Sequence, residues 1–217
     1  MSDMLDCTDL ANRPIAIATA ARAVKSGSVV VLPTDTLYGI GADAFNPEAV
    51  ASLLAAKGRG RDMPVPVLVG SWSTIDGLVS FVPSILRDLV EAFWPGGLTV
   101  VVEHAPSLAW DLGDARGTVA IRMPLHPVAI DLLTETGPMA VSSANVTSQP
   151  PAVTAQQAYA QLGESVSVYL DGGEVPVGRP STIVDLTGEV PTVLREGAID
   201  LAALREVVPG VVGRPVG

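Results

Sequence analysis

Strand-like and helix-like segments alternate along nearly the whole chain, and this alternation restricts the fold more than any other feature of the sequence. Short apolar runs bounded by Gly and Pro are followed by segments with helix start and stop signals. This order predicts an α/β domain, in which helices flank a sheet. We expect one domain over residues 1–217, with a core at about 14–208 and a loose Gly/Pro/Val tail at 209–217.

Several of the expected elements have recognisable ends. Pro14 suits the first turn of a helix over 14–26, and Asn46 and Pro47 suit the N-cap and first position of the next helix, which should end near Lys57. Between them we expect a strand at 28–32 and a glycine-bearing loop at 33–44. The remaining expected strands are 65–69, 98–102, 118–122, 139–141, 166–170, 182–186 and 192–194, and the remaining clear helices are 83–93, 127–134 and one that follows Thr154.

Composition restricts the location and the partners of the protein. Although 48% of the 217 residues are hydrophobic, no run reaches the roughly 18 to 20 apolar residues that span a membrane. Residues 1–7 do not resemble a secretion signal, and Cys7 is the only cysteine, so we expect a cytoplasmic protein without an intramolecular disulfide. The net charge of -10 disfavours a broad phosphate-binding surface and direct binding of nucleic acid.

Several common catalytic motifs are missing or incomplete. Residues 39–44 match G-x-G-x-x-[GA], but helix signals begin only at Asn46, so we interpret these glycines as a backbone turn rather than a dinucleotide site. The chain contains no P-loop motif. Ser142 and Ser143 lack a G-x-S-x-G elbow, and two separated histidines with one cysteine offer no metal-ligand spacing. These absences disfavour serine hydrolysis and His/Cys metal chemistry.

The positive charges are few, and four of them stand out. Lys57 and Arg59 alternate with glycine after a predicted helix, where they either complement the helix dipole or bind phosphates. Arg122 and Arg195 each end a predicted strand, where a cation either forms a structural ion pair or receives a carboxylate. Residues 142–145 follow another strand and form either a Ser/Asn turn or a site for phosphate and ribose oxygens. The residues alone leave these alternatives open.

Eight short motifs, taken together in their order and spacing, resemble the YrdC-like family, the threonylcarbamoyl-AMP synthases. The likeness extends from about residue 28 to 197, and the set is far more specific than any one motif. Longer members carry an extra carboxy-terminal domain, so we expect the short form here. The motifs are PTDTLYGIG at 33–41, KGR at 57–59, FWPGGLT at 93–99, VAIRMP at 119–124, SAN at 143–145, DGG at 171–173, STIVD at 181–185 and LREG at 194–197.

The resemblance implies a twisted, mostly parallel or mixed sheet with a concave cleft. It also implies an enzyme that makes threonylcarbamoyl-AMP and pyrophosphate from L-threonine, bicarbonate and ATP, with Mg²⁺ carried on the ATP. The product would pass to the complex that transfers the threonylcarbamoyl group to tRNA. By the resemblance, Lys57 and Arg59 are catalytic, Lys57, Arg59, Ser143, Asn145 and Arg195 bind ATP, and Thr34, Arg122 and Ser181 line the threonine site.

Two positions depart from the family pattern. Leu68 stands where many members carry the histidine of P-L-x-V-H, which bears on a contact to threonine or its carbamate. Gly60 replaces the proline of K-G-R-P and changes the stiffness of the loop. Two other functions remain as alternatives: an RNA-binding module of the same fold, and a domain that adenylates carbamoyl phosphate.

Overall fold

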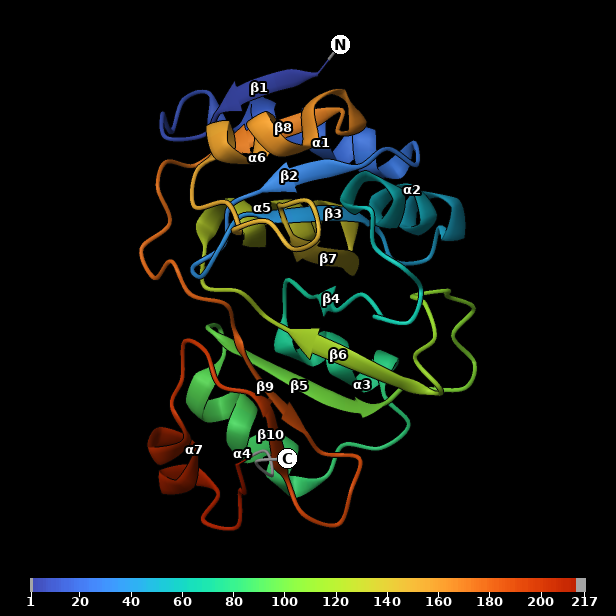
Figure 1. Ribbon diagram of the computed structural model, residues 1–217, viewed down its shortest axis with the longest axis vertical. Coiled ribbons are helices and arrows are strands. Elements are labelled where there is room, and N and C mark those ends of the chain that lie inside the picture. The colour runs from blue at the N-terminus through green and yellow to red at the C-terminus, as the bar shows by residue number, and fades with distance from the viewer. Residues whose placement is uncertain (1, 214–217) are drawn as a thin grey trace.

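Ten strands form one mixed sheet in the computed structural model, which describes residues 2–213 (Figure 1). Among the described residues, four pairings of neighbouring strands are parallel and five are antiparallel. The α/β class is therefore confirmed, and the sheet is mixed rather than mostly parallel. The strands are β1 (Asp3–Asp6), β2 (Val30–Leu32), β3 (Gly39–Asp43), β4 (Val67–Leu68), β5 (Leu98–Glu103), β6 (Thr118–Arg122), β7 (Met139–Ser143), β8 (Val168–Asp171), β9 (Thr182–Asp185) and β10 (Thr192–Arg195), in the order β1-β8-β2-β3-β7-β4-β6-β5-β9-β10.

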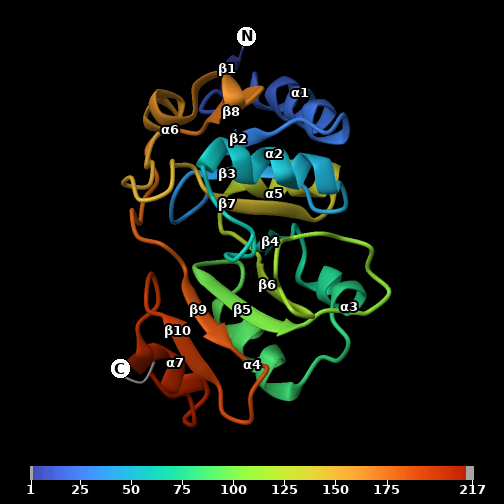
Figure 2. The same ribbon diagram turned by 45° about the vertical axis from the view of Figure 1, so that its right-hand side comes forward.

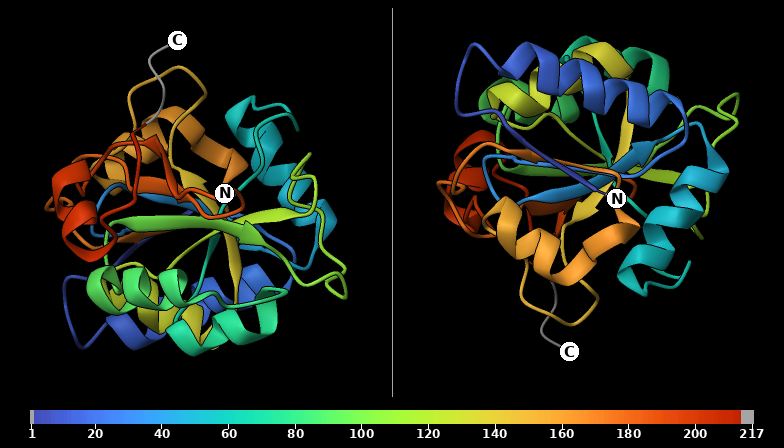
Figure 3. Two further views of the ribbon diagram at one scale, coloured as in Figure 1. Left: turned by 90° about the horizontal axis from the view of Figure 1, so that it is seen from below. Right: turned by 90° about the horizontal axis from the view of Figure 1, so that it is seen from above.

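Helices cover both faces of the sheet. They are α1 (Arg13–Lys25), α2 (Pro47–Lys57), α3 (Ile75–Leu78), α4 (Ser84–Phe93), α5 (Pro127–Thr136), α6 (Ala155–Leu162) and α7 (Leu201–Val207), with short 3-10 turns at Trp72–Thr74 and Gly163–Ser165. Figure 3 shows α1, α3, α4 and α5 on one side of the sheet and α2 and α6 on the other. No helix within residues 2–213 is long and apolar enough to cross a membrane.

The ends of α2 show how local sequence sets the helix boundaries. The Asn46 side chain accepts a hydrogen bond from the Ala49 amide, Pro47 occupies the first turn, and Gly58 ends the helix in the left-handed region at φ 59°. Glycine is suited to that last position because it has no Cβ to clash there. The expected start and end of this helix are both confirmed, and Thr154 likewise caps α6 through the Gln157 amide.

The expected loop at 33–44 is wrong in its second half, because residues 39–43 form strand β3 between β2 and β7. Glycine has a low strand propensity, but here it allows close packing. A Cβ at Gly39 would lie 2.6 Å from Cγ1 of Val141, and one at Gly41 would lie 2.9 Å from Cε of Met139. These glycines are therefore neither a dinucleotide fingerprint nor a turn.

The two ends of the described chain are more ordered than we expected. The polar segment Asp3–Asp6 adds an edge strand parallel to β8, which no hydrophobic pattern indicated. Near the other end, Val211 is buried, and the Val212 carbonyl accepts a hydrogen bond from the Val193 amide at 2.9 Å. Val211 and Val212 are therefore held by backbone hydrogen bonds, whereas Pro209 and Gly210 are exposed, and residues 214–217 of the expected tail lie outside the described residues.

The sheet is divided at its centre into two half-sheets. The first contains β1, β8, β2, β3 and β7, the second contains β4, β6, β5, β9 and β10, and β4 and β7 pair through only two residues each. Figure 2 shows the segment between β8 and β9 passing from the first half-sheet to the second. In β5, Leu98 and Val100 face a core shared with α4, while Thr99 and Val101 face a cavity between the half-sheets. Strand alternation therefore provides the floor of that cavity.

Candidate functional site

A cavity of about 610 Å³ lies where the two half-sheets meet. The first half-sheet and its loops supply hydroxyl and amide groups from residues 34–39 and 142–145, and the second supplies Arg122, Ser181 and Arg195. Arg59 reaches the same cavity from the loop after α2. No Asp or Glu is among the described residues that line it. A concave site with three arginines and no lining carboxylate is suited to an anionic ligand.

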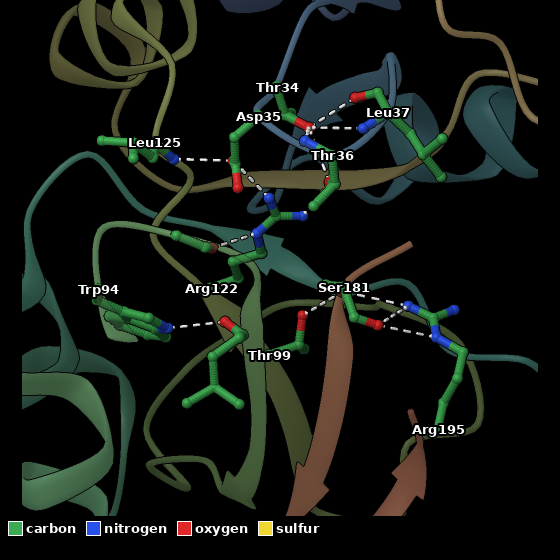
Figure 4. A network of polar contacts seen from close by, with 12 residues as sticks. Thr34, Asp35, Thr36, Leu37, Trp94, Thr99, Arg122, Leu125, Ser181 and Arg195 are labelled. Carbon is green, nitrogen blue, oxygen red and sulfur yellow. Dashed lines mark hydrogen bonds and ion pairs between the residues drawn. The ribbon is translucent and has the colours of Figure 1, made fainter. Parts of the chain in front are cut away.

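Arg122 is held at the end of β6 by a buried network (Figure 4). Its Nη2 donates to Oδ1 of Asp35 at 2.6 Å, its Nη1 to the Thr36 hydroxyl at 2.8 Å, and its Nε to the Gly96 carbonyl at 2.8 Å. Burial lowers the pKa of Arg122, and the charge of Asp35 opposes this shift. Arg122 therefore forms a structural ion pair with Asp35, the first of the two roles that the sequence allowed. It also lines the cavity.

Thr34 organises the loop between β2 and β3. Its hydroxyl donates to the Leu37 carbonyl at 2.6 Å and accepts from the Leu37 and Thr36 amides, both at 3.2 Å. The hydroxyl proton is therefore already committed to the turn. Thr34 does line the cavity, where its role is to fix the loop that carries Asp35.

Ser181, just before β9, and Arg195, at the end of β10, form a second polar group. The Arg195 guanidinium donates twice to the Ser181 carbonyl, at 2.8 and 3.0 Å, and once to the Ser181 hydroxyl at 3.1 Å. That hydroxyl also lies 2.8 Å from the hydroxyl of Thr99 (Figure 4). Burial lowers the pKa of Arg195, and the positive charges of Arg122 and Arg59 lower it further. The mutual repulsion of these cations favours an anionic ligand between them.

The LREG motif requires glycine at position 197 for a steric reason. A Cβ there would collide with the carbonyl oxygen of Pro180 and lie 2.7 Å from that of Ser181. Gly197 also donates its amide to the Thr182 hydroxyl at 2.9 Å. This close approach keeps Arg195 beside Ser181.

Substituting alanine for Gly197 is expected to lower the free energy of unfolding by about 1–3 kcal/mol, since the added methyl group must displace backbone. Chemical denaturation measured by circular dichroism would test this. Gly210→Ala is the matched control, because a Cβ at Gly210 meets no atom within 4 Å. Equal stability of the two variants would contradict the steric explanation.

Arg59 extends along the edge of the cavity. Its Nη1 donates to the Ser142 hydroxyl at 2.9 Å, its Nε to the Met63 carbonyl at 2.9 Å, and its Nη2 to the Pro64 carbonyl at 3.0 Å. Burial lowers the pKa of Arg59, although it remains a cation at neutral pH. Its guanidinium is therefore fixed in orientation and positioned to meet a ligand.

Lys57 lies beneath the loop that follows β7 and is not among the residues that line the cavity. Its side chain is buried, and its ammonium donates to the Ser143 carbonyl and, at 2.7 Å, to the Asn145 carbonyl. No carboxylate of the described residues pairs with it. Burial lowers the pKa of Lys57 to about 8, and the charge of Arg59 adds to this effect. Lys57 thus holds the backbone on which Ser143 and Asn145 stand.

Asn145 presents an unused acceptor. Its Nδ2 donates to the Val146 and Gln149 carbonyls at 2.8 and 3.0 Å, while its Oδ1 is buried and has no hydrogen-bond partner among the described residues. Buried polar atoms are nearly always paired in proteins. Asn145 is among the residues that line the cavity, so this unpaired acceptor lies next to the site.

The structure brings together most of the residues that the sequence singled out. Seven of them line the one cavity: Thr34, Arg59, Arg122, Ser143, Asn145, Ser181 and Arg195. Leu68 lines it as well, so the departure from the family pattern is at the site itself.

His126 occupies the N-cap position of α5, but its side chain makes no capping hydrogen bond.

Sequence reasoning assigned no role to three contributors, Asp35, Thr36 and Thr99, and it named Ser142 only as part of the segment 142–145. A signal for Asp35 was present, because a buried arginine needs a carboxylate and Asp35 lies just after the predicted buried strand at 28–32. Thr36 and Thr99 are small hydroxyl side chains with no distinctive spacing.

Comparison with known proteins agrees with this geometry. The family model for Sua5, YciO and YrdC, described as "Telomere recombination", matches residues 22–197. A protein of Mycobacterium tuberculosis (strain CDC 1551 / Oshkosh) named "Putative threonylcarbamoyl-AMP synthase" is 60% identical over 96% of this chain and 96% of its own length. The threonylcarbamoyl-AMP synthase of Bacillus subtilis (strain 168) is 35% identical over 94% of this chain and 60% of its own length.

A solved structure with this fold carries a ligand. P. abyssi Sua5 complexed with L-threonine superposes with a TM-score of 0.91 at 30% identity, over 99% of this chain and 63% of the longer Sua5 chain. The present chain therefore spans less than two thirds of that protein. The family match, the close relatives and the shared fold show that this chain belongs to the Sua5/YciO/YrdC family.

Proposed function

We propose that this protein is a threonylcarbamoyl-AMP synthase, which makes threonylcarbamoyl-AMP and pyrophosphate from L-threonine, bicarbonate and ATP. The observation that carries the proposal is the convergence of Arg59, Arg122 and Arg195 on one cavity together with Ser143 and Asn145. The names of the relatives support it, since the M. tuberculosis and B. subtilis proteins both bear the name of this activity.

The reaction needs positioning and charge stabilisation more than a protein nucleophile. Bicarbonate and the threonine amine condense to a carbamate with loss of water, and a carbamate oxygen then attacks the α-phosphorus of ATP. The bond to the β-phosphate oxygen breaks, and pyrophosphate leaves. Cations and small donors that surround the phosphates lower the barrier of such a step. The lining residues are of these types.

Within this proposal the residues divide by location. Arg59 and Arg195 contact the phosphates, Ser143 and Asn145 bind the nucleotide, and Lys57 supports them through the backbone and adds its charge from below. Arg122 directs its remaining donors to the threonine carboxylate, and Thr34 and Ser181 shape the threonine pocket. Sua5, whose structure was solved with L-threonine, supports the presence of an amino-acid site in this fold.

Mg²⁺ enters the proposal as part of the ATP substrate. Within residues 2–213 no group of three or more His, Cys, Asp or Glu side chains is arranged to hold a metal ion. Triphosphate oxygens are good ligands for Mg²⁺, which keeps several of its waters. A cytoplasmic location and transfer of the product to a tRNA-modifying complex complete the proposal.

Pyrophosphate release is expected only when threonine, bicarbonate and ATP are all present, because the carbamate must form before the α-phosphorus is attacked. The assay omits each substrate in turn, in buffer freed of carbon dioxide for the bicarbonate omission. Release that continues without threonine, and that carbamoyl phosphate stimulates, would favour the carbamoyl-phosphate alternative. Salt-sensitive binding of RNA without turnover would favour the RNA-binding alternative.

A further inference from the structure

The wall of the cavity that carries Asn145 has no regular secondary structure. Residues 144–154 connect β7 to α6 outside any helix or strand. Such a segment has no helical or sheet ladder to fix it, so its conformation depends on individual hydrogen bonds. The accuracy with which Asn145 is placed therefore depends on the side chains that bind this backbone.

The first part of the segment is held from within and from α2. Asn145 Nδ2 donates to the Val146 and Gln149 carbonyls, and the Thr147 amide donates to the Lys57 carbonyl at 2.9 Å. These bonds fix one side of the turn. They leave the Val146 amide and the Pro150 carbonyl to be satisfied by another group.

Gln161, near the end of α6, satisfies both. Its Oε1 accepts from the Val146 amide at 3.1 Å, and its Nε2 donates to the Pro150 carbonyl at 2.9 Å. One side-chain amide thus joins the two ends of the turn over residues 146–150. Because Val146 follows Asn145 directly and its carbonyl receives the Asn145 amide, Gln161 is one residue away from the cavity wall.

We propose that Gln161 is a positioning residue for the ATP site, acting through the turn at 146–150. This inference rests on the proposed function, in which Asn145 binds the nucleotide. Without Gln161 the turn has more conformations available, and Asn145 is held in the binding orientation for less of the time. The affinity for ATP then falls, whereas the threonine pocket, which is built around Arg122 and Ser181, keeps its affinity.

The test compares two glutamines of the same helix. Gln161→Met keeps the size of the side chain and removes both hydrogen bonds, while Gln157→Met removes one bond, at 2.9 Å, to the Val153 amide at the far end of the segment. Two neutral hydrogen bonds correspond to about a tenfold change in an equilibrium. We expect Gln161→Met to raise the Kd and KM for ATP about tenfold with an unchanged KM for threonine, and Gln157→Met to change each less than about threefold.

A third variant tests the mechanism without depending on the folding of the first. Gln161→Glu keeps an acceptor for the Val146 amide and loses the donor to Pro150, so its Kd for ATP should lie between those of the wild type and Gln161→Met. The measurement is made at high salt, which screens the added charge. A Kd for Gln161→Glu equal to or above that of Gln161→Met would overturn the proposal.

The remaining outcomes separate this inference from the proposed function. Equal ATP affinity in Gln161→Met and Gln157→Met would overturn the role of Gln161, and so would a parallel loss of ATP and threonine affinity with a lowered Tm. Failure of the wild-type protein to bind ATP by calorimetry would instead refute the proposed function. A tenfold loss confined to ATP would support both.

Discussion

Replacing Asp35 by alanine is expected to lower the free energy of unfolding by about 3–5 kcal/mol, because it leaves the charge of Arg122 buried and unpaired. Both side chains are largely inaccessible, Asp35 being 7% and Arg122 6% exposed, and they are 2.6 Å apart. Asp35 also accepts the Leu125 amide at 2.9 Å, so a second buried donor would lose its partner. Urea denaturation would measure the loss, and the assay for pyrophosphate would show loss of turnover.

The chain offers a matched control for this prediction. Asp111 and Arg61 form an ion pair at 2.5 Å, but their side chains are 43% and 53% exposed. Exposed pairs contribute little to stability, so Asp111→Ala should have a much smaller effect. The double variant Asp35→Leu with Arg122→Met should recover stability without recovering turnover. Similar losses for Asp35→Ala and Asp111→Ala would contradict the role of the buried pair.

Lys57→Met is expected to reduce kcat/KM for ATP by about 100-fold or more. The substitution removes two charge-assisted hydrogen bonds to the backbone of Ser143 and Asn145, each worth about 1.5–3 kcal/mol, and one tenfold step in rate corresponds to about 1.4 kcal/mol. Lys25→Met is the control, because the only other lysine of the chain is exposed at the end of α1. Near-normal turnover of Lys57→Met would refute the assigned role.

The same variant has a second readout, because burial lowers the pKa of Lys57 to about 8 from an ordinary value of 10.5. Between these two values the unfolded chain holds a proton that the folded protein has lost, so the free energy of unfolding rises with pH across this window. Below pH 8 both states are protonated, and the destabilisation is fully present. The wild type should gain stability relative to Lys57→Met from pH 8 to 10.5, and parallel pH profiles would contradict the assignment.

Local sequence was sufficient to predict the elements whose ends carry capping residues, proline or glycine. Asn46, Pro47 and Gly58 set the limits of α2, and Thr154 sets the start of α6, because capping involves only neighbouring residues. The strand at 118–122 agrees in both limits, since its apolar residues are bounded by Gly117 and by Pro124. These features need no knowledge of the rest of the fold.

Other features depend on contacts between distant segments, which no local pattern contains. The glycines of β3 are stable as a strand only because Val141 and Met139 fill the space beside them, about a hundred residues later in the chain. The orientation of the Lys57 side chain also depends on residues that are distant in the sequence. Its charge suggested a contact with phosphate, whereas the fold turns its ammonium toward the carbonyls of Ser143 and Asn145.

The residues that line the cavity were predicted better than their contacts. Motif resemblance identified Arg122 as a cavity residue, but its partner Asp35 comes from the other half-sheet and could be paired with it only by the fold. For the same reason Gln161 gave no signal in the sequence, since a glutamine on an amphipathic helix is usually solvated. Its importance becomes visible only when its two backbone partners are known.

The Asp35–Arg122 pair connects the two half-sheets close to the short pairing of β4 with β7. The two residue pairs of β4 and β7 are a short connection between the half-sheets. The ion pair and the Arg122–Thr36 hydrogen bond add two further contacts from one half-sheet to the other. These contacts join the two walls of the cavity to each other. Walls that are already joined cost a ligand less ordering on binding, so these two contacts link the architecture of the sheet to the affinity of the site.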